Sequence, residues 1–367
     1  MSIYAFRSLR KQTVRTVLSI SGISLCLLLM LFLLSAYNGV KKGSLDYIEK
    51  NPADLWVLQK NATNVLRCTS VLFANQEYII KNIPNVKSVH PILLVLATVG
   101  SENSQTTIYL CGYEPSGHLG GPPEIIEGHH IENDNEIVLD YSFARKYDYH
   151  VGQTISIKHN KLAIVGLSSG TNAFVVQYAF VSLTRAQALI NYPIITAFLI
   201  RIEETSKIDT TMQMITGRLT DVEVYDHETF VLNNLRELQA GFLPFVLTIV
   251  GIGIVVLTVV LSLLLSINII EQRKDFAIMK IIGSSGRFLI MEILGQSFVL
   301  SLFGYLMAGL CLWPLIKFIA ILTPEVTVLP TLVHFVVVLL ITGCIATLSA
   351  GFSMLKLRKI YPMEVFQ

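Results

Sequence analysis

The stretch Glu271–Gly286, EQRKDFAIMKIIGSSG, decides the fold assignment because it is a short charged segment between two long apolar runs. Acidic residues come first, at Glu271 and Asp275, Lys280 follows, and Gly283 comes after the last apolar residues. This order suits the dipole of a helix and a glycine at its end. The pattern predicts a short amphipathic helix at a membrane boundary that offers side chains to a partner protein.

The composition excludes an ordinary soluble protein. The 367 residues have a mean hydropathy of +0.58, and only 15% of them are charged. About 20 helical residues are needed to cross the hydrocarbon core of a bilayer. Four runs without Asp, Glu, Lys or Arg are long enough: Thr16–Val40, Leu238–Ile270, Ile293–Ile316 and Val326–Leu355. We therefore expect four transmembrane helices.

Basic residues concentrate in three short segments, before the first run, between the second and third, and after the fourth. They are Arg7, Arg10, Lys11 and Arg15, then Arg273, Lys274, Lys280 and Arg287, and finally Lys356, Arg358 and Lys359. The positive-inside rule places these segments in the cytoplasm. We expect a multi-pass protein of the bacterial cytoplasmic (inner) membrane with both termini inside. The first run is too long for a signal peptide and is interpreted as a permanent anchor.

Between Ala53 and Tyr225 the pattern changes to short β-like runs separated by turn residues, which predicts an inserted α+β extracytoplasmic domain. Its best defined part, Ile137–Leu167, predicts a strand, a helix, a turn at Gly152 and a hairpin. The stretch GTNAFVVQYAF, Gly170–Phe180, is interpreted as an exposed loop that contacts a substrate or an adaptor, or as a packed connection.

The charged stretch resembles the coupling-helix motif of the FtsX/MacB-type ABC transporter permeases, the type VII or mechanotransmission type. In that family the helix docks on the ATPase subunit. This chain departs from the usual motif at Asp275, Phe276 and Ser284. The alternative is an ordinary basic loop in another polytopic protein. The resemblance implies ATPase-coupling roles for Glu271, Arg273, Lys274, Asp275, Phe276, Ala277, Ile278, Met279, Lys280, Ile282 and Gly283.

The resemblance extends to other parts of the chain. The order of elements in Ile137–Leu167 resembles the MacB periplasmic core. The family often has a glutamate at the position of Glu292, which implies a structural coupling role; the alternative is that its side chain only reaches toward water. The closing segment has the basic residues, Pro362 and Glu364 of the family but lacks the Tyr-Pro usually found upstream.

The resemblance gives the chain the following expected order. A cytoplasmic amphipathic helix (1–15) precedes a transmembrane helix with a stalk (16–52) and the MacB-like core domain (53–225). A second stalk and transmembrane helix (226–270), the coupling helix (271–287), a transmembrane helix (288–316), a short outer loop (317–325), a transmembrane helix (326–355) and a cytoplasmic tail (356–367) follow.

Small residues in the first two spans let another helix approach closely. Ser19 and Gly22 lie in the first span, and Gly251 and Gly253 lie in the second. They are candidates for a dimer seam, and the alternative is packing within one chain.

The sequence contains no motif for chemistry of its own. It has no GxxxxGK[ST], HExxH, GxSxG or CxxC, so we expect no catalytic residues, and ATP with Mg to be bound by a partner ATPase. The pair His129 and His130 is interpreted as a solvated loop rather than a metal site. Whether Cys68 and Cys111 form a disulfide stays open.

The resemblance implies the permease subunit of an exporter, a homodimer that works with a separate ABC ATPase, with or without a membrane-fusion adaptor, and with no nucleic-acid partner. Few charged residues line the spans, which favours a cargo handled outside or at the outer leaflet. The candidates are a lipid or lipoprotein, a drug, a peptide or haem. The alternative is an FtsX-like regulator of a cell-wall hydrolase. The large extracytoplasmic domain favours the exporter, since the regulator typically has a smaller one.

Overall fold

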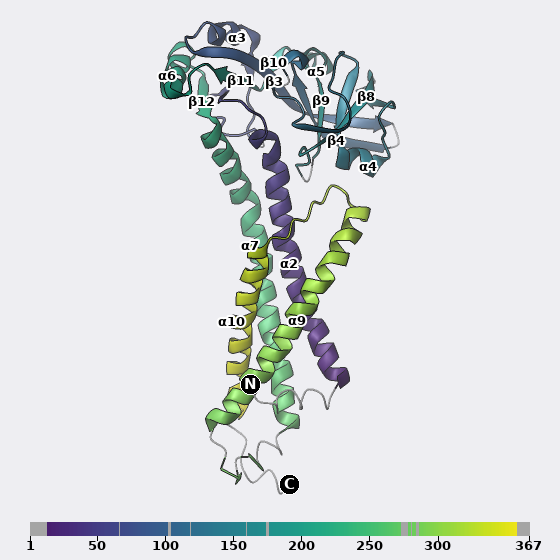
Figure 1. Ribbon diagram of the computed structural model, residues 1–367, viewed down its shortest axis with the longest axis vertical. Coiled ribbons are helices and arrows are strands. Elements are labelled where there is room, and N and C mark those ends of the chain that lie inside the picture. Colours follow the sequence, from purple (N-terminus) through teal and green to yellow (C-terminus); the bar gives the residue numbers. More distant parts are fainter. Residues whose placement is uncertain are drawn as a thin grey trace. The chain divides into compact units, whose positions relative to one another are not determined.

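A computed structural model describes residues 13–65, 67–101, 104–117, 119–158, 160–173, 176–272, 278–279, 281–283 and 286–357 (Figure 1). The described residues form two compact units. The helical unit contains residues up to 38, 243–318 and those from 328 onward, and the α+β unit contains 39–242 and 319–327.

Four long helices have the length and composition to cross a membrane, as expected from the apolar runs. They are α2 (Thr13–Glu49), α7 (His227–Glu271), α9 (Gly286–Leu322) and α10 (Leu332–Leu357). Both α2 and α7 continue without a break into the residues of the α+β unit.

Small polar side chains join the helices inside the helical unit. The Ser349 and Ser353 hydroxyls on α10 donate to backbone carbonyls of α7, at Thr258 (3.1 Å) and Ser262 (2.9 Å). On α9, Ser297 donates to the carbonyl of Ala346 of α10 over 2.8 Å. Such hydroxyl–carbonyl bonds are typical of helix packing in membranes, where no water competes for the donor.

The connection between α9 and α10 lies later in the chain than expected. Helix α9 continues to Leu322 rather than ending near Ile316, and α10 begins at Leu332 rather than Val326. Two physical reasons account for the late start of α10. Pro330 has no N–H for a helical bond, and Leu329 is bound to α2 by its N–H (to the Ser35 carbonyl, 3.0 Å) and its carbonyl (from Asn38 Nδ2, 3.1 Å).

One mixed sheet organises the described part of the α+β unit. Its strands are β1 (Leu55–Gln59), β3 (Val86–Ser101), β4 (Ser104–Tyr113), β5 (Glu124–Gly128), β6 (Glu136–Asp140), β7 (Thr154–Ile157), β8 (Asn160–Ser169), β9 (Tyr178–Ser182), β11 (Ala197–Ile202) and β12 (Val222–Asp226). The order is β12-β1-β11-β3-β4-β9-β6-β8-β5, and β7 pairs with β3 and β8. A separate pair joins β2 (Leu72–Phe73) to β10 (Ile194–Ile195).

Short helices cover this sheet. They are α3 (Ala74–Lys81), α4 (Tyr141–Tyr147), α5 (Leu183–Ile190) and α6 (Ile208–Arg218), with single 3-10 turns at Pro115–Gly117 and Thr205–Lys207. The turn and hairpin predicted within Ile137–Leu167 are present, and Gly152 has a φ of 91°, a conformation that glycine adopts without strain. Neither α6 nor β12 was predicted.

Strand β1 is buried on both faces, which explains its nearly continuous apolar sequence. Its side chains alternate between two cores. Leu55 and Val57 pack in a core with residues of α3 and α6, such as Ile80 and Ile215. On the other face, Trp56 and Leu58 join a core that includes Tyr47 and Ile48 of α2 and Phe230 of α7. The ends of the two long helices are therefore part of the interior of the α+β unit.

The exposed-loop interpretation of Gly170–Phe180 is wrong for much of its described part. Thr171 is fully buried, and Tyr178 and Phe180 lie in β9 with 1% or less of their surface exposed. The packed connection is the correct alternative there. Both Cys68 and Cys111 have free thiols.

Candidate functional site

The predicted coupling helix is described only in part. Residues 273–277, 280, 284 and 285 lie outside the described residues, and so do the amphipathic N-terminal segment up to residue 12 and the closing segment from residue 358. Glu271 ends α7. The Ile282 N–H donates to the Ile278 carbonyl over 3.0 Å, which is one helical turn, and Gly283 follows with a φ of 98°.

The described part of this segment exposes apolar surface. Ile278 is 44% exposed, Ile281 55% and Ile282 80%. Exposed apolar side chains that lie together mark a surface that contacts a partner or a membrane. Met279, between them, is half-buried. The assignment of these residues to ATPase coupling stays a prediction.

Glu292 lies in a buried polar cluster near the start of α9. Its side chain is only 2% exposed, and Gln296, one turn later, is 1% exposed. The Gln296 Nε2 donates to Gln272 Oε1 over 3.4 Å, which ties the start of α9 to the residue after α7. This burial argues against the alternative in which Glu292 only reaches toward water. Its coupling role stays a prediction.

The four candidate seam residues have different surroundings within the helical unit. Ser19 is 7% exposed. A Cβ on Gly253 would lie 3.0 Å from Met30 Cε, so this glycine lets α2 approach α7 within one chain. Around Gly22 and Gly251, no other described part of the chain comes within 4 Å of where a Cβ would lie. Only the last two leave room for another helix.

The end of α2 is anchored in the aromatic core of the α+β unit. The Tyr47 ring stacks on Tyr178 at a centroid distance of 4.8 Å, and its hydroxyl donates to the Gly120 carbonyl over 2.8 Å. Four residues later, Asn51 Oδ1 accepts from the N–H of the same glycine, also over 2.8 Å. The aromatic ring of this helix end is therefore held by β9, and its polar groups are held by Gly120, in the segment after β4.

Cys111 lies beside Tyr47 and has an unreactive thiol. Its Sγ is 3.4 Å from the Tyr47 hydroxyl, and its side chain is fully buried. Burial raises the pKa of Cys111 to about 12, although the hydrogen bond between Cys111 and Tyr47 acts in the opposite direction. The group stays a neutral thiol at physiological pH, so it packs rather than reacts.

The start of α7 is anchored in the same core. Phe230 stacks on Trp56 of β1 with ring centroids 4.5 Å apart. One turn later the fully buried Asn234 accepts from the Val65 N–H over 3.2 Å and donates to the Phe230 carbonyl over 2.8 Å. Asp226 Oδ2 accepts from the Thr229 N–H over 3.1 Å and so caps the start of α7.

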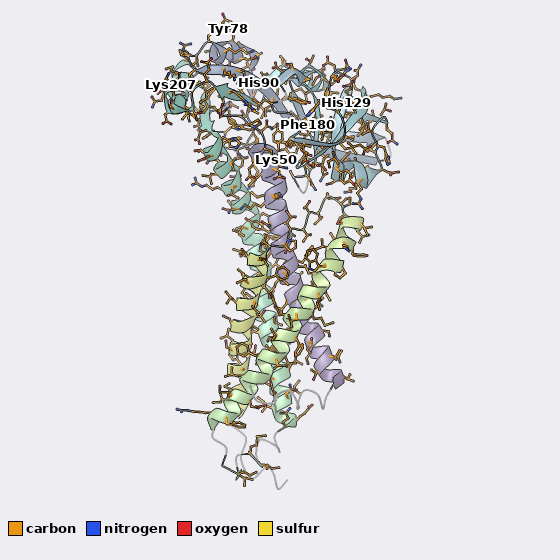
Figure 2. All side chains as sticks on the ribbon, viewed as in Figure 1. Lys50, Tyr78, His90, His129, Phe180 and Lys207 are labelled. Atoms are coloured by element: carbon orange, nitrogen blue, oxygen red, sulfur yellow. The ribbon has the colours of Figure 1, made fainter. Side chains whose placement is uncertain are left out.

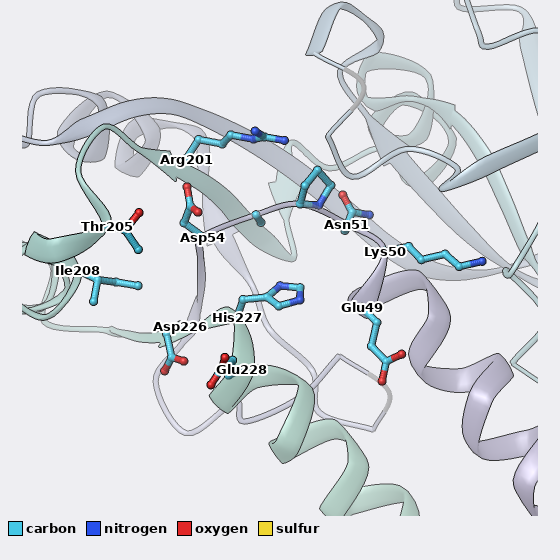
Figure 3. A pocket seen from close by; sticks show the side chains of 12 residues that line it. Glu49, Lys50, Asn51, Asp54, Arg201, Thr205, Ile208, Asp226, His227 and Glu228 are labelled. Atoms are coloured by element: carbon cyan, nitrogen blue, oxygen red, sulfur yellow. The ribbon is translucent and has the colours of Figure 1, made fainter.

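A cavity of about 530 Å³ lies between the end of α2 and the start of α7, within the α+β unit (Figure 3). Asp54 connects two elements that line this cavity, α7 and β11. Its carbonyl accepts from the His227 N–H (3.1 Å), and its Oδ2 accepts from the Ile202 N–H (2.9 Å). Figure 3 shows His227 extending from the start of α7 toward the segment after α2. The lining is charged: Glu49, Lys50, Asp54, Arg201, Asp226 and Glu228 contribute to it.

The pair His129 and His130 follows β5, and His129 Nδ1 lies 2.7 Å from the His130 carbonyl oxygen (Figure 2). In the part of the chain that the structure describes, no three His, Cys, Asp or Glu side chains are arranged to hold a metal ion.

None of the anchoring residues was predicted from the sequence. Tyr47 and Phe230 lie within three residues of a helix end, and Trp56 lies in the first strand after α2, where helical periodicity changes to β-like periodicity. Large aromatic residues at such a change are a usable signal, because a helix end that enters a core needs bulky side chains to fill it. Their partners, such as Tyr178, have no local signal.

Comparisons with known proteins cover nearly the whole chain. The family model described as the MacB-like periplasmic core domain matches residues 16–218, and the FtsX-like permease C-terminal model matches residues 247–362. A curated relative, named "Putative hemin transport system permease protein HrtB" from Staphylococcus haemolyticus, is 23% identical over 344 residues, which is 92% of this chain and 91% of that protein.

Two solved structures resemble parts of the chain. The periplasmic region of MacB from Actinobacillus actinomycetemcomitans has 13% identity and a TM-score of 0.40, and the match covers 49% of this chain and 91% of that one. The extracellular domain of the noncanonic ABC-type transporter YknZ from Gram-positive bacteria has 12% identity and a TM-score of 0.38, with 47% and 99% covered.

The core-domain model alone spans more than half of the sequence, and the permease model covers the last two long helices together with the segment that precedes them. Four apolar helices and a mixed α/β unit accompany these matches. The chain belongs to the family of FtsX/MacB-like ABC transporter permeases.

Proposed function

We propose that this chain is the membrane subunit of an ABC exporter that transmits the closure of a separate ATPase to the α+β unit and thereby moves an amphipathic cargo. ATP and Mg are bound by the ATPase, and this chain contributes no catalytic residue. The membership in a permease family supports this proposal, because permeases of ABC systems work with an ATPase subunit.

The observation that carries the proposal is the anchoring of α2 and α7 in the aromatic core of the α+β unit. With 37 residues, α2 is about 55 Å long, and the 45 residues of α7 give about 68 Å. A bilayer needs only about 30 Å. The remaining length ends at Tyr47 and Phe230, so a tilt of either helix acts directly on that core. In the proposed mechanism these two helices transmit the movement to the α+β unit.

The ATPase is proposed to act on these helices through the segment around Glu271–Gly283. This segment and both chain termini are proposed to lie on the cytoplasmic side. Its exposed Ile278, Ile281 and Ile282 offer an apolar surface for the ATPase. The hydrogen bond from Gln296 to Gln272 ties α9 to the residue after α7. A movement of the segment would then reach α7 and α9 together.

We further propose a homodimer, because the described residues of one copy contain four candidate spans, which is half of what a complete exporter is expected to have. Gly22 and Gly251 leave room for a second helix and are the favoured seam residues, while Gly253 already packs on Met30. A membrane-fusion adaptor belongs to this proposal as an optional partner.

Among the candidate cargoes, haem is the first to test, because the printed name of the curated relative HrtB refers to hemin transport. At 23% identity this relation motivates the experiment and does not decide the cargo. Lipids or lipoproteins, drugs and peptides are the other candidates.

The test uses the permease co-purified with its ATPase and reconstituted in lipid vesicles. If the chain is an exporter, hemin should raise the ATPase rate. Hemin should also cross the vesicle membrane only when ATP is present. A panel of lipopeptide, macrolide and peptide is run in parallel. If ATP is hydrolysed with no movement of any cargo, while an added cell-wall hydrolase is activated, the exporter proposal is wrong and the regulator takes its place.

A further inference from the structure

We propose that Glu325 fastens the connection between α9 and α10 to the α+β unit, so that this connection moves with that unit and forms a third link beside α2 and α7. The movement itself rests on the function proposed above. The fastening stands on contacts within the α+β unit alone, which includes residues 319–327.

Glu325 is held by its side chain and by its backbone. Its Oε1 accepts from Lys146 Nζ at 2.5 Å, and the two side chains are only 17% and 39% exposed. Its backbone carbonyl accepts from Asn172 Nδ2 over 2.8 Å. The donors come from two different places, the last turn of α4 and the segment before β9. Two contacts from separate elements fix the position of a residue more firmly than a single ion pair does.

Asn172 is itself fixed by three neighbours. Its Nδ2 also lies 3.3 Å from the Ser142 hydroxyl of α4, and its Oδ1 accepts from Gln177 Nε2 over 3.2 Å. A Cβ on Gly43 of α2 would lie 2.2 Å from the Asn172 carbonyl oxygen, so only glycine permits this approach. The segment that holds Glu325 therefore rests directly on the part of α2 that belongs to the α+β unit.

The connection is shaped to present Glu325. Thr323 donates its N–H to the Ile319 carbonyl over 2.7 Å at the end of α9, and the Val326 N–H returns to the Thr323 carbonyl over 3.0 Å. Pro324 cannot continue the helical bonding, so a turn forms with Glu325 at its tip. Because the turn is set by local bonds, little conformational freedom is lost when Glu325 meets Lys146.

The charge partners can be exchanged to test the link. In the reconstituted complex, Glu325→Lys or Lys146→Glu alone places like charges together, and we expect the cargo-stimulated ATPase rate to fall about fivefold, the low end of typical coupling between sites. The double exchange restores opposite charges and returns the rate to within about twofold of the unchanged protein. The proposal is overturned if the single exchanges have no effect or if the double exchange is no better than either one.

A matched pair in the same unit controls for charge reversal itself. Lys81 and Glu77 also lie 2.5 Å apart, but both belong to α3, so they link no separate segments. Exchanging them singly or together leaves the rate unchanged if the effect at Glu325 comes from the link. An equal loss at α3 would contradict the proposal.

A second measurement separates the fastening from the exporter function. The double variant that carries both Lys146→Cys and Glu325→Cys is treated in native membranes with a short thiol cross-linker. The two variants that carry one of these substitutions each are the controls. The cross-link forms in the chain alone, and with the ATPase present its yield is the same without nucleotide and with trapped ATP. A missing cross-link, or a yield that changes with nucleotide, overturns the proposal even where the exporter function holds. A stable cross-link without any transport leaves the fastening correct and the exporter function wrong.

Discussion

At the scale of single residues, Cys111 gives a direct test of the core that receives α2. The thiol is fully buried, and burial raises its pKa to about 12. Since the thiolate is the reactive form, we expect no labelling by a maleimide at pH 8 in the folded protein and rapid labelling in denaturant. A chain that retains only this cysteine allows the measurement by mass. Labelling of the native chain at the rate of an exposed thiol would mean that the core at Tyr47 is open.

His90 of β3 makes the stability of the α+β unit depend on pH. Its Nε2 lies 3.0 Å from the Ser88 hydroxyl, and burial, followed by the charges of Lys81 and Arg201, lowers the pKa of His90 below its usual value. The unfolded state, with a histidine pKa of about 6.5, then binds more protons than the folded state. The contribution of His90 to stability is fully present above pH 6.5 and is lost as the pH falls from there through the lower pKa of the folded state.

Thermal unfolding of the detergent-solubilised chain at pH 7.5 and pH 5.5 checks this sign. We expect a lower midpoint at pH 5.5, and a smaller difference in His90→Gln, which keeps a polar side chain but does not titrate. An unchanged difference in the variant would show that other groups cause the dependence.

At the scale of elements, the crossing of α2 and α9 depends on Gly304. A Cβ there would lie 2.5 Å from Ile23 Cγ2 and 3.0 Å from Ile23 Cβ. Gly304→Ala therefore forces the two helices apart, and overpacking of this kind typically costs about 1–3 kcal/mol. The thermal midpoint of the solubilised chain should fall accordingly.

The matched variant is Gly22→Ala on α2, where no other described part of the chain lies within 4 Å of the new Cβ. It should leave the midpoint of the monomer unchanged, and it should weaken the homodimer if Gly22 lies on the seam, as seen by native mass spectrometry. Equal midpoints for the two variants would contradict the packing of α2 on α9.

The elements also show which parts of the fold can be predicted from the sequence. The long helices were predictable because uncharged apolar runs have few alternatives to a membrane span. Helix α6 was missed because its stripe of Ile208, Met212 and Ile215 is diluted by threonines, although its spacing is helical. The start of α10 was placed too early because Val326–Pro330 is apolar, and only the bonds of Leu329 to α2 and the proline make it non-helical.

The sequence allows a prediction for the candidate site only where a motif is local, and that prediction is untested. The coupling stretch and Glu292 are recognisable from consecutive residues. The stack of Tyr47 on Tyr178 and the ion pair of Lys146 with Glu325 join residues more than a hundred positions apart. No local pattern specifies such pairs, because they depend on a sheet order in which neighbours in space are rarely neighbours in sequence.

At the scale of the whole molecule, the proposed function requires that force enters at the coupling segment and leaves through helices anchored in the α+β unit. In that proposal the ATPase is the source of the force, so an apolar contact at the coupling segment must matter, while an exposed aromatic residue of α3 must not. Met279 and Phe276 are two of the apolar positions to which the resemblance gives an ATPase-coupling role, and Tyr78, 75% exposed on α3, is the matched control (Figure 2).

The most direct measurement is the ATPase activity of the co-purified complex in lipid, with the unchanged chain and with Met279→Asp, Phe276→Asp and Tyr78→Asp. A charge in an apolar contact typically costs several kcal/mol, so the first two variants should detach the ATPase or lower its cargo-stimulated rate at least about tenfold. Tyr78→Asp should behave as the unchanged chain. If all three complexes form and hydrolyse ATP alike, the coupling segment does not transmit force and the proposed mechanism is wrong.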